Sequence, residues 1–493
     1  MKKKSVIKSS TITDAACYLC QKAACCLPED VYEGIEDLYR RETSETAKGF
    51  LAETLLNAEI AAKTMRPICQ DTGITVVFVE LGQNVVIEGD TLNVAINKGV
   101  ERGYKEGCLR KSIVKDAIFD RTNTGNNIPA IVHTEIVEGD KIKITVAPKG
   151  SGSENMSALK MFKPANGEED IVDFVVDTVK NAGSNSCPPL HIGVGIGGTM
   201  EYACLLAKKA LLNRAIPLSE LEEHAKTDKR RALELKILSS VQKTGVGAQG
   251  MGGSCTAFAV SVETYPCHIA GLPVAVNLNC HAARHAAMVI DENTVLPEIT
   301  PTAFENGAEI AANIDYSSYK KVALPLSDDD INGLKAGDRV LLSGEIYTAR
   351  DAAHKKIVTA LKAGEQLPFD LQNQLIYYAG PCPAAENEVI GPIGPTTAGR
   401  MDVYTPLLLD KGLKGVIGKG YRSAEVIEAI KHNRAVYFTA TGGAACLLAQ
   451  KVLSADMVAY PELGAEAVYK LKVKDFPAIV NVDSTGRSVS KPD

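Results

Sequence analysis

The sequence predicts an α/β protein that is built from two unlike parts. A mixed α+β pattern occupies residues 1–290, and strands alternate regularly with helices from residue 321 to residue 493. Such alternation is typical of a layered α/β domain. Between the two parts, Pro297 and Pro301 interrupt the pattern and apolar residues become sparse. We therefore expect an N-terminal domain at 1–290, a linker at 291–320 and a C-terminal domain at 321–493.

The N-terminal part contains both helical and β patterns. The alanine-rich segment 13–26 is typical of a helix, and the continuous apolar run at 74–81 predicts a buried strand. Two β-rich runs within 130–147 flank the turn sequence at 138–141, which predicts a hairpin. Residues 171–182 place apolar side chains on one helical face, and Gly183 is suited to end that helix.

The C-terminal part repeats a simple strand-and-helix pattern. Its predicted strands are 339–347, 415–418 and 435–440, and its predicted helices begin near residues 351, 424 and 444.

Composition and charge exclude several classes of protein. The net charge is −6, so no basic excess indicates nucleic-acid binding, and no apolar run is long enough to cross a membrane. The basic start at Met1–Lys4 is followed by a segment too polar for a signal peptide. We therefore expect a cytoplasmic protein whose thirteen cysteines are reduced.

Two eye-catching motifs have simpler explanations. The group Cys17, Cys20, Cys25 and Cys26 suggests an iron–sulfur site, but the segment is helical in pattern, and free cysteines are commonly buried core residues. The run 193–198 fits G-x-G-x-x-G, yet the acidic residues about 20 positions later lie in a polar stretch and do not follow a strand. We interpret neither motif as a cofactor site.

Several less regular segments carry the functional signal. They are CQDTG at 69–73, LRKS at 109–112, KGSGS at 149–153, NSCPP at 185–189, YPCH at 265–268, NCHAARH at 279–285, TARDAAH at 348–354, GPTTAGRMD at 394–402 and GKG at 418–420. In this order they resemble the class I fumarase and L-tartrate dehydratase family, with the α and β parts fused in one chain. The resemblance implies a cluster-binding N-terminal domain and a swivelling-type C-terminal α/β domain.

The resemblance implies one 4Fe–4S cluster per chain, held by Cys69, Cys187 and Cys280. Each of these cysteines lies in a turn segment and not inside a helical pattern. Three ligands leave one iron free to act as a Lewis acid, whereas a fourth cysteine would close the site. Taken singly, each thiol fits a buried structural role better than a cluster ligand, so the assignment depends on the motifs together.

The family also implies an acid–base pair, Asp71 and Thr396, and a further active-site residue, His268. A threonine hydroxyl is a poor base without help, so we expect a neighbouring carboxylate to polarise it. Without the resemblance, Asp71 fits a turn residue and Thr396 fits a helix N-cap.

A dicarboxylate substrate needs positive charge at both ends. The substrate-binding positions implied by the family are Gln70, Asp71, Arg110, Gly152, Arg350, Thr396, Arg400 and Lys419. Two of them have independent support, since Arg350 precedes a predicted helix and Lys419 follows a predicted strand, which are natural anion sites.

The resemblance therefore implies a fumarate hydratase that interconverts fumarate and L-malate, a step of the tricarboxylic acid cycle, and the family suggests a homodimer. The nearest alternative is an L-tartrate dehydratase, which uses the same cluster. A more distant alternative is an iron–sulfur sensor or electron carrier built on the Cys17–Cys26 group, which has no need for four substrate cations.

Overall fold

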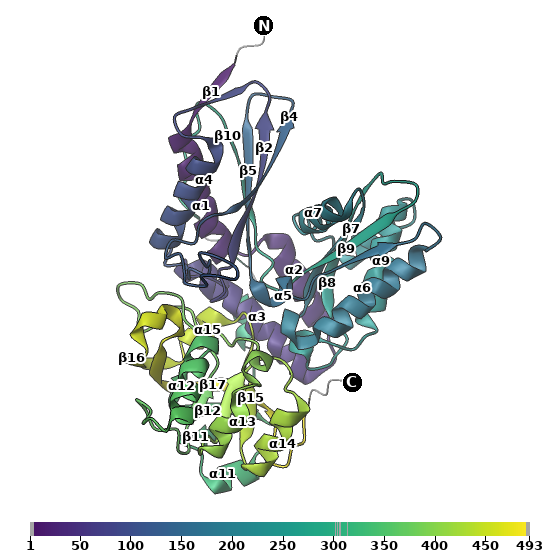
Figure 1. Ribbon diagram of the computed structural model, residues 1–493. Helices are drawn as coiled ribbons and strands as arrows, with labels where there is room; N and C mark the ends of the chain where they lie inside the picture. Colours follow the sequence, from purple (N-terminus) through teal and green to yellow (C-terminus); the bar gives the residue numbers. More distant parts are fainter. Residues whose placement is uncertain (1–3, 301, 303, 305–306, 313, 490–493) are drawn as a thin grey trace.

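The structure is a computed structural model that describes residues 4–489, apart from residues 301, 303, 305–306 and 313. Three layered units surround two central helices (Figure 1). Part of the predicted linker and the basic residues Met1–Lys3 lie outside the described residues. The predicted division into domains stays a prediction, although β10 ends at Ile290 and β11 begins at Lys320.

The first unit is a four-stranded sheet with two helices on one face. Its strand order is β10-β5-β2-β4, formed by β10 (Ala286–Ile290), β5 (Ile142–Lys149), β2 (Ile74–Gly82) and β4 (Ile131–Val137). Helices α1 (Ser9–Cys25) and α4 (Leu92–Glu106) pack side by side against it, and strands β1 (Ser5–Lys8) and β3 (Val85–Glu88) form a separate pair. All four cysteines of the 17–26 group are buried, and three of them lie on α1, as predicted.

The predicted hairpin at 130–147 is wrong. Its two strands exist as β4 and β5, but β2 lies between them and pairs with both, parallel to β4 and antiparallel to β5. The end of β2 also reaches the intervening turn, where Gly82 N donates to Lys141 O over 2.9 Å and Asn84 N donates to Gly139 O over 3.0 Å. The apolar β2 strand therefore occupies the pairing edges that a hairpin would use.

The second unit is another four-stranded sheet, with order β6-β9-β7-β8. Its strands are β6 (Ala158–Phe162), β9 (Leu272–Asn279), β7 (Leu190–Gly197) and β8 (Ala257–Tyr265). Helices α6 (Glu168–Ala182) and α9 (Lys229–Gln242) cover one face together with α8 (Leu218–His224), and α7 (Met200–Ala210) covers the other. Gly183 ends α6 with a positive φ of 47°, as predicted.

The glycine-rich 193–198 motif lies within and just after strand β7, not in a loop that follows a strand. A Cβ on Gly193 or Gly195 would lie 2.1 Å from a carbonyl oxygen of α7. The glycines therefore allow α7 to approach the sheet closely, and this packing role replaces the dinucleotide-binding interpretation.

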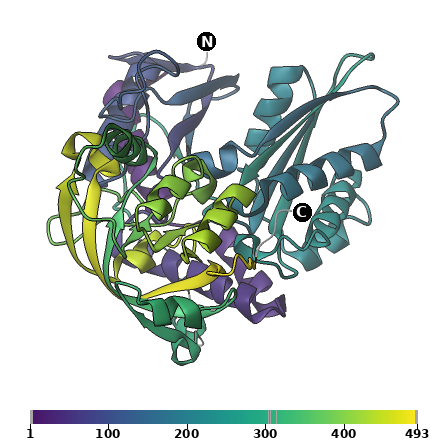
Figure 2. The ribbon, with the colours of Figure 1, turned by 60° about the horizontal axis from the view of Figure 1, so that its bottom comes forward.

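The third unit is a seven-stranded sheet that closes on itself. Its order is β11-β12-β13-β14-β15-β17-β16, and an additional pairing joins β12 (Arg339–Thr348) to β17 (Val468–Val482). The remaining strands are β11 (Lys320–Ala323), β13 (Leu375–Tyr377), β14 (Gly415–Gly418), β15 (Val436–Thr439) and β16 (Val452–Ala459). These strands appear in green and yellow in Figure 2.

Several α-helices accompany this sheet. They are α11 (Asp328–Gly333), α12 (Asp351–Ala363), α13 (Thr405–Asp410), α14 (Ala424–His432) and α15 (Ala445–Ala449). The predicted helix starts near 351, 424 and 444 are confirmed, and so is the α/β fold class. The closing strand β17 was not predicted.

Helices α2 (Glu29–Arg41) and α3 (Glu45–Thr64) lie where the units meet. Their buried side chains share one core with Phe258 of the second unit and with Cys446 and Ile479 of the third. Helix α10 (Gly307–Ala312) packs on α3. The two central helices therefore join segments that are distant in sequence.

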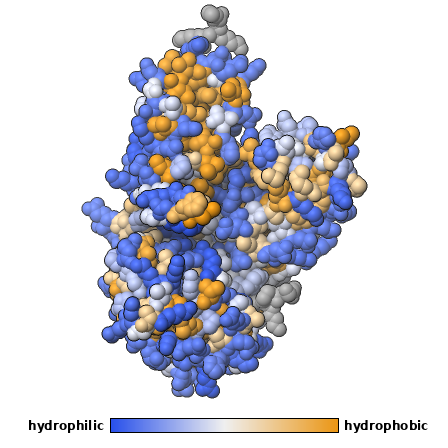
Figure 3. All heavy atoms as spheres, in the orientation of Figure 1, coloured by the Kyte–Doolittle hydropathy of each residue, from blue (hydrophilic) through white to orange (hydrophobic). Residues whose placement is uncertain are grey.

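None of the described helices is long and apolar enough to cross a membrane. On the face shown in Figure 3, hydrophilic residues predominate over the C-terminal unit, and apolar residues gather mainly on the first unit.

We predict that Gly195→Ala destabilises the fold by about 1–3 kcal/mol or more, because its methyl group would overlap the backbone of α7. The free energy of unfolding in urea measures this effect. The matched control is Gly271→Ala, where a Cβ has no neighbour within 4 Å and should change stability by no more than about 0.5 kcal/mol. Equal effects of the two substitutions would contradict the packing role.

Candidate active site

One cavity of about 330 Å³ lies where the units meet. Both the N-terminal and the C-terminal parts line it. Every predicted site residue except His268 lies in its wall: Cys69, Gln70, Asp71, Arg110, Gly152, Cys187, Cys280, Arg350, Thr396, Arg400 and Lys419.

Three thiols enter the cavity from separate turns. Cys69 follows α3, Cys187 ends the short helix η1 (Gly183–Ser186) with a positive φ of 54°, and Cys280 follows β9. Burial raises the pKa of all three thiols. Two cations oppose this effect, because Arg284 lies near Cys69 and Cys280 while Lys419 Nζ donates to Cys187 Sγ. These cations favour the thiolate form that binds metal.

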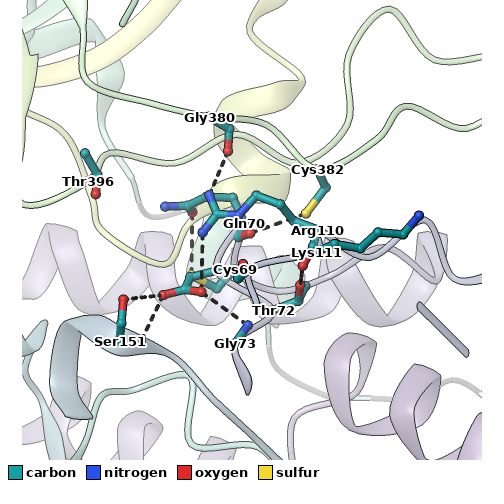
Figure 4. A network of polar contacts seen from close by, with 12 residues as sticks. Cys69, Gln70, Thr72, Gly73, Arg110, Lys111, Ser151, Gly380, Cys382 and Thr396 are labelled. Carbon is teal, nitrogen blue, oxygen red and sulfur yellow. Dashed lines mark hydrogen bonds and ion pairs between the residues drawn. The ribbon is translucent and has the colours of Figure 1, made fainter. Parts of the chain in front are cut away.

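Asp71 is held as a carboxylate by groups from three segments. Its oxygens accept from Ser151 N at 3.0 Å and Gly73 N at 3.2 Å, and Arg110 Nη2 lies 3.3 Å away (Figure 4). Burial alone would raise the pKa of Asp71, but the Arg110 and Arg284 guanidinium groups outweigh it and lower the pKa to about 2. Asp71 is therefore ionised at neutral pH and accepts hydrogen bonds without donating one.

The cations of the C-terminal part crowd one another. Burial, together with the nearby Arg110 and Arg400 guanidinium groups, lowers the pKa of Arg350 to about 10. Carboxylates compensate only partly, with Glu466 at 3.3 Å from Arg350 and Asp351 at 3.2 Å from Arg400. The Nε of Arg350 is buried and has no hydrogen-bond acceptor in the described part of the chain. This side of the cavity is therefore suited to an anion.

Thr396 lies beside these cations and not at a helix cap. Its Oγ accepts a hydrogen bond from Arg400, and its carbonyl oxygen accepts from Lys419 N at 3.2 Å. The N-cap residue of the following helix η4 (Ala398–Met401) is Thr397. The Thr396 hydroxyl is therefore available to the cavity, with Arg400 as its polarising neighbour.

Gln70 and Gly152 complete the predicted set. Gln70 is buried, and its Nε2 donates to Pro395 O over 3.3 Å, which joins the CQDTG and GPTTAGRMD segments. Gly152 lies in α5 (Ser151–Glu154), where a Cβ would lie 3.4 Å from Lys419 Nζ. A side chain at position 152 would thus reduce the space beside the lysine.

The structure does not bring His268 to the cavity. His268 is exposed in the turn between β8 and β9, and its Nδ1 accepts from Ala270 N at 3.1 Å. Cys280 follows the opposite end of β9, a strand of eight residues that spans about 26 Å. His268 therefore does not line this cavity within the chain, and its role in the site, which the family resemblance implied, stays a prediction.

Arg284 lines the cavity and was not assigned from the sequence. Its side chain is buried, its Nη2 donates to Asp71 O, and its Nε has no acceptor among the described residues. The available signal was its place in NCHAARH, four positions after Cys280. The buried Arg284 guanidinium therefore places positive charge beside the Cys69 and Cys280 thiols and the Asp71 carboxylate.

The three thiols fit a cluster better than a single ion. Among the described residues, no group of three His, Cys, Asp or Glu side chains is arranged to hold one metal ion. In an iron–sulfur cluster each thiolate binds its own iron, so the sulfur ligands are arranged around the cluster and do not all point at one metal ion. Thiols at separate positions around a 330 Å³ cavity, with cations behind them, fit that requirement.

Thiols, crowded cations and an ionised carboxylate in one cavity are the features of an enzyme that acts on a small anion. Comparison with known proteins gives the family. The family model described as fumarate hydratase matches residues 13–289, and the model described as the fumarase C-terminus matches residues 288–492. The chain belongs to the fumarate hydratase family, whose members are hydro-lyases.

Individual relatives cover most of the chain. It is 35% identical over 469 residues to the anaerobic class I fumarate hydratase of Escherichia coli (strain K12), covering 91% of this chain and 84% of that protein. It is 31% identical over 494 residues to a putative class I fumarate hydratase of Geobacillus stearothermophilus, with 94% and 92% covered. A putative L(+)-tartrate dehydratase subunit alpha of Methanocaldococcus jannaschii is 40% identical over 281 residues, covering 56% of this chain and 96% of that subunit.

We predict that Asp71 stays ionised down to about pH 4. Its pKa falls from 3.8 to about 2 on folding, so its contribution to stability is complete above about pH 4 and is lost as the pH falls towards 2. The difference in unfolding free energy between the wild type and Asp71→Asn, on the order of 2 kcal/mol, should be constant from pH 7 to pH 4.5. Urea denaturation at a series of pH values measures it, and a difference that collapses between pH 7 and pH 5 would disprove the assignment.

Proposed function

We propose that this protein catalyses the reversible hydration of fumarate to L-malate in the described cavity, with one 4Fe–4S cluster held by Cys69, Cys187 and Cys280. The observation that carries the proposal is the cavity itself, which brings three thiols together with four arginines and a lysine. Fumarate is a small dianion, so its two carboxylates match this excess of positive charge. The class I fumarate hydratases among the relatives support the same activity.

When bound, the cluster would supply an iron without a protein ligand, which acts as a Lewis acid on a substrate hydroxyl and carboxylate. All further steps fall to side chains of this chain. Arg110, Arg350 and Arg400 hold the substrate carboxylates, each charge pair at about 4 Å being worth on the order of 4 kcal/mol at an effective dielectric near 20. The ammonium group of Lys419 lies beside Cys187 and faces the charge that grows on the substrate carboxylate.

We propose that Thr396 moves the proton at C3: in hydration its hydroxyl gives its proton to C3 as water adds OH to C2, and the proton that the water loses returns Thr396 to the hydroxyl form. Elimination from malate runs in the reverse direction. The Arg400 guanidinium donates to its Oγ and stabilises the negative charge that forms when the hydroxyl loses its proton. Asp71 remains a carboxylate and accepts a hydrogen bond from the water or hydroxyl that is added or removed at C2, which orients it. This division of roles modifies the sequence-based expectation that a carboxylate polarises Thr396, because the polarising partner in the structure is Arg400.

An anaerobic assay of the reconstituted protein tests the function. Fumarate, L-malate and the two tartrate enantiomers are supplied separately, and product is measured. We expect turnover of fumarate and L-malate and little or none of either tartrate. Preferential turnover of a tartrate would favour the dehydratase alternative, and no turnover of any substrate by cluster-loaded protein would contradict both. Cytoplasmic location, a homodimer and a place in the tricarboxylic acid cycle stay predictions from the family resemblance.

The cluster ligands can be tested by substitution. Replacing Cys69, Cys187 or Cys280 with Ser should abolish the visible absorption of the cluster and the activity together, because each thiolate binds a different iron. Cys20→Ser is the control, since that thiol is fully buried in α1, away from the cavity. A variant of Cys20 that loses the absorption, together with a Cys280 variant that keeps it, would refute the assignment.

Steady-state kinetics separates proton transfer from substrate binding. Thr396→Ala should lower kcat by roughly 10²–10⁴-fold with the cluster retained, as expected for a positioned proton-transfer group. Arg350→Met should chiefly raise KM, because Arg350 holds a carboxylate in both the ground and transition states. An unchanged kcat in Thr396→Ala would exclude a role in proton transfer.

A further inference from the structure

A glycine turn of the C-terminal part lies against the cysteine segments of the N-terminal part. Residues 441–447, here called the 441–447 loop, run from β15 into α15, and all seven are buried. A Cβ on Gly442 would lie 3.0 Å from Cys187 Sγ, and one on Gly443 would lie 2.5 Å from the ring of His281. Glycine is therefore required at both positions for this close approach.

The segment that carries Cys69 is joined to the loop by Asn57 of α3. The amide Nδ2 donates to Ile68 O over 2.9 Å and to Gly443 O over 3.0 Å. Its Oδ1 accepts from the backbone N–H groups of Cys446 at 2.9 Å and Leu447 at 3.0 Å. The side chain is fully buried, and both its amide nitrogen and its amide oxygen are hydrogen-bonded within these two segments.

The segment that carries Cys187 is joined to the same loop by Gln249. Its Oε1 accepts from Gly442 N at 3.0 Å, and its Nε2 donates to Gly442 O over 3.3 Å. Its backbone N–H donates to Pro188 O over 2.9 Å, next to Cys187. Gln249 has a positive φ of 55°, a conformation that costs a residue with a side chain about 1–2 kcal/mol, so its amide is placed here at the expense of local strain.

The segment that carries Cys280 is joined to the loop by the next residue. His281 Nε2 lies 2.7 Å from Gly442 O, and the ring is buried. Gly442 O therefore accepts from both Gln249 and His281. The loop is thus hydrogen-bonded by three side chains: Asn57, which also binds the Cys69 segment, Gln249, which also binds the Cys187 segment, and His281, which follows Cys280.

We infer that Asn57, Gln249 and His281 are positioning residues that use the 441–447 loop to hold the three thiols in the spacing that the cluster requires. The inference rests on the proposed function. None of the three residues was among the expected site residues, and none lines the cavity. Because the loop belongs to the C-terminal part, retention of the cluster depends on docking of that part and not only on the cysteine segments themselves.

Gln249 offers a matched experiment. Gln242 is a second, partly buried glutamine whose amide also bridges backbone groups: Nε2 donates to Ala257 O over 2.7 Å, and Oε1 accepts from Thr256 N at 2.7 Å. Its contacts lie within the second unit and involve neither the loop nor a cysteine segment. Gln249→Met and Gln242→Met therefore each remove one side-chain amide that bridges backbone groups, the first at the loop and the second within the second unit.

The measurement is the anaerobic rate at which iron passes from reconstituted full-length protein to a ferrous chelator, followed together with the visible absorption of the cluster. We expect Gln249→Met to lose iron roughly 10- to 100-fold faster than the wild type, the range typical when a partner outside the ligand set is removed. Gln242→Met should lose iron at the wild-type rate. Asn57→Ala, which frees the Cys69 segment, should behave as Gln249→Met does and provides a second test if Gln249→Met fails to fold.

Equal rates for Gln249→Met, Asn57→Ala and Gln242→Met would overturn the inference while leaving the proposed function intact. Failure of both Gln249→Met and Asn57→Ala to fold would also overturn it, because a purely structural role would then explain these residues. A wild-type protein that takes up no cluster would overturn the proposed function, and this inference with it.

Discussion

The concentration of positive charge in one cavity is the constraint on which the site depends. The cavity is lined by Arg110, Arg284, Arg350, Arg400 and Lys419. Three carboxylates form ion pairs with the arginines: Asp71 with Arg110, Glu466 with Arg350, and Asp351 with Arg400. Burial first, and then the neighbouring Arg110 and Arg400 guanidinium groups, lower the pKa of Arg350. Such a charge excess persists only when the surrounding structure enforces it and when an anion relieves it. Under the proposed function, thiolates bound to the cluster and the dicarboxylate substrate would supply the anions that relieve it.

The fold enforces this arrangement by assembling the site from distant segments. Helices α2 and α3 share a core with the second and third units, and the 441–447 loop contacts the cysteine segments. No single unit contains the whole site, since the cysteines precede residue 290 and Thr396, Arg400 and Lys419 follow residue 321. The packing that joins the three units therefore also assembles the cavity.

The features predicted well from the sequence were local. Strand β2, helices α6, α12 and α14 and the turn positions of Cys69, Cys187 and Cys280 follow from patterns within a few residues. The features missed depend on contacts between distant segments. The insertion of β2 between β4 and β5 and the closure of the C-terminal sheet by β17 leave no mark in local periodicity. Likewise, Arg284 and His268 both lie in motifs that resemble the family, and only the path of β9 shows that one lines the cavity and the other does not.

The most direct test of this account is whether the buried positive charge selects a dicarboxylate. Succinate and butyrate have four carbons each but differ by one carboxylate, and neither has a double bond to hydrate. We predict that succinate inhibits the anaerobic, cluster-loaded enzyme competitively, with an inhibition constant at least about tenfold lower than that of butyrate, since a hydrogen bond to a charged group contributes about 1.5–3 kcal/mol. Its inhibition should weaken as ionic strength rises. Equal inhibition by the two compounds would contradict the claim that the cationic cavity is the dicarboxylate site.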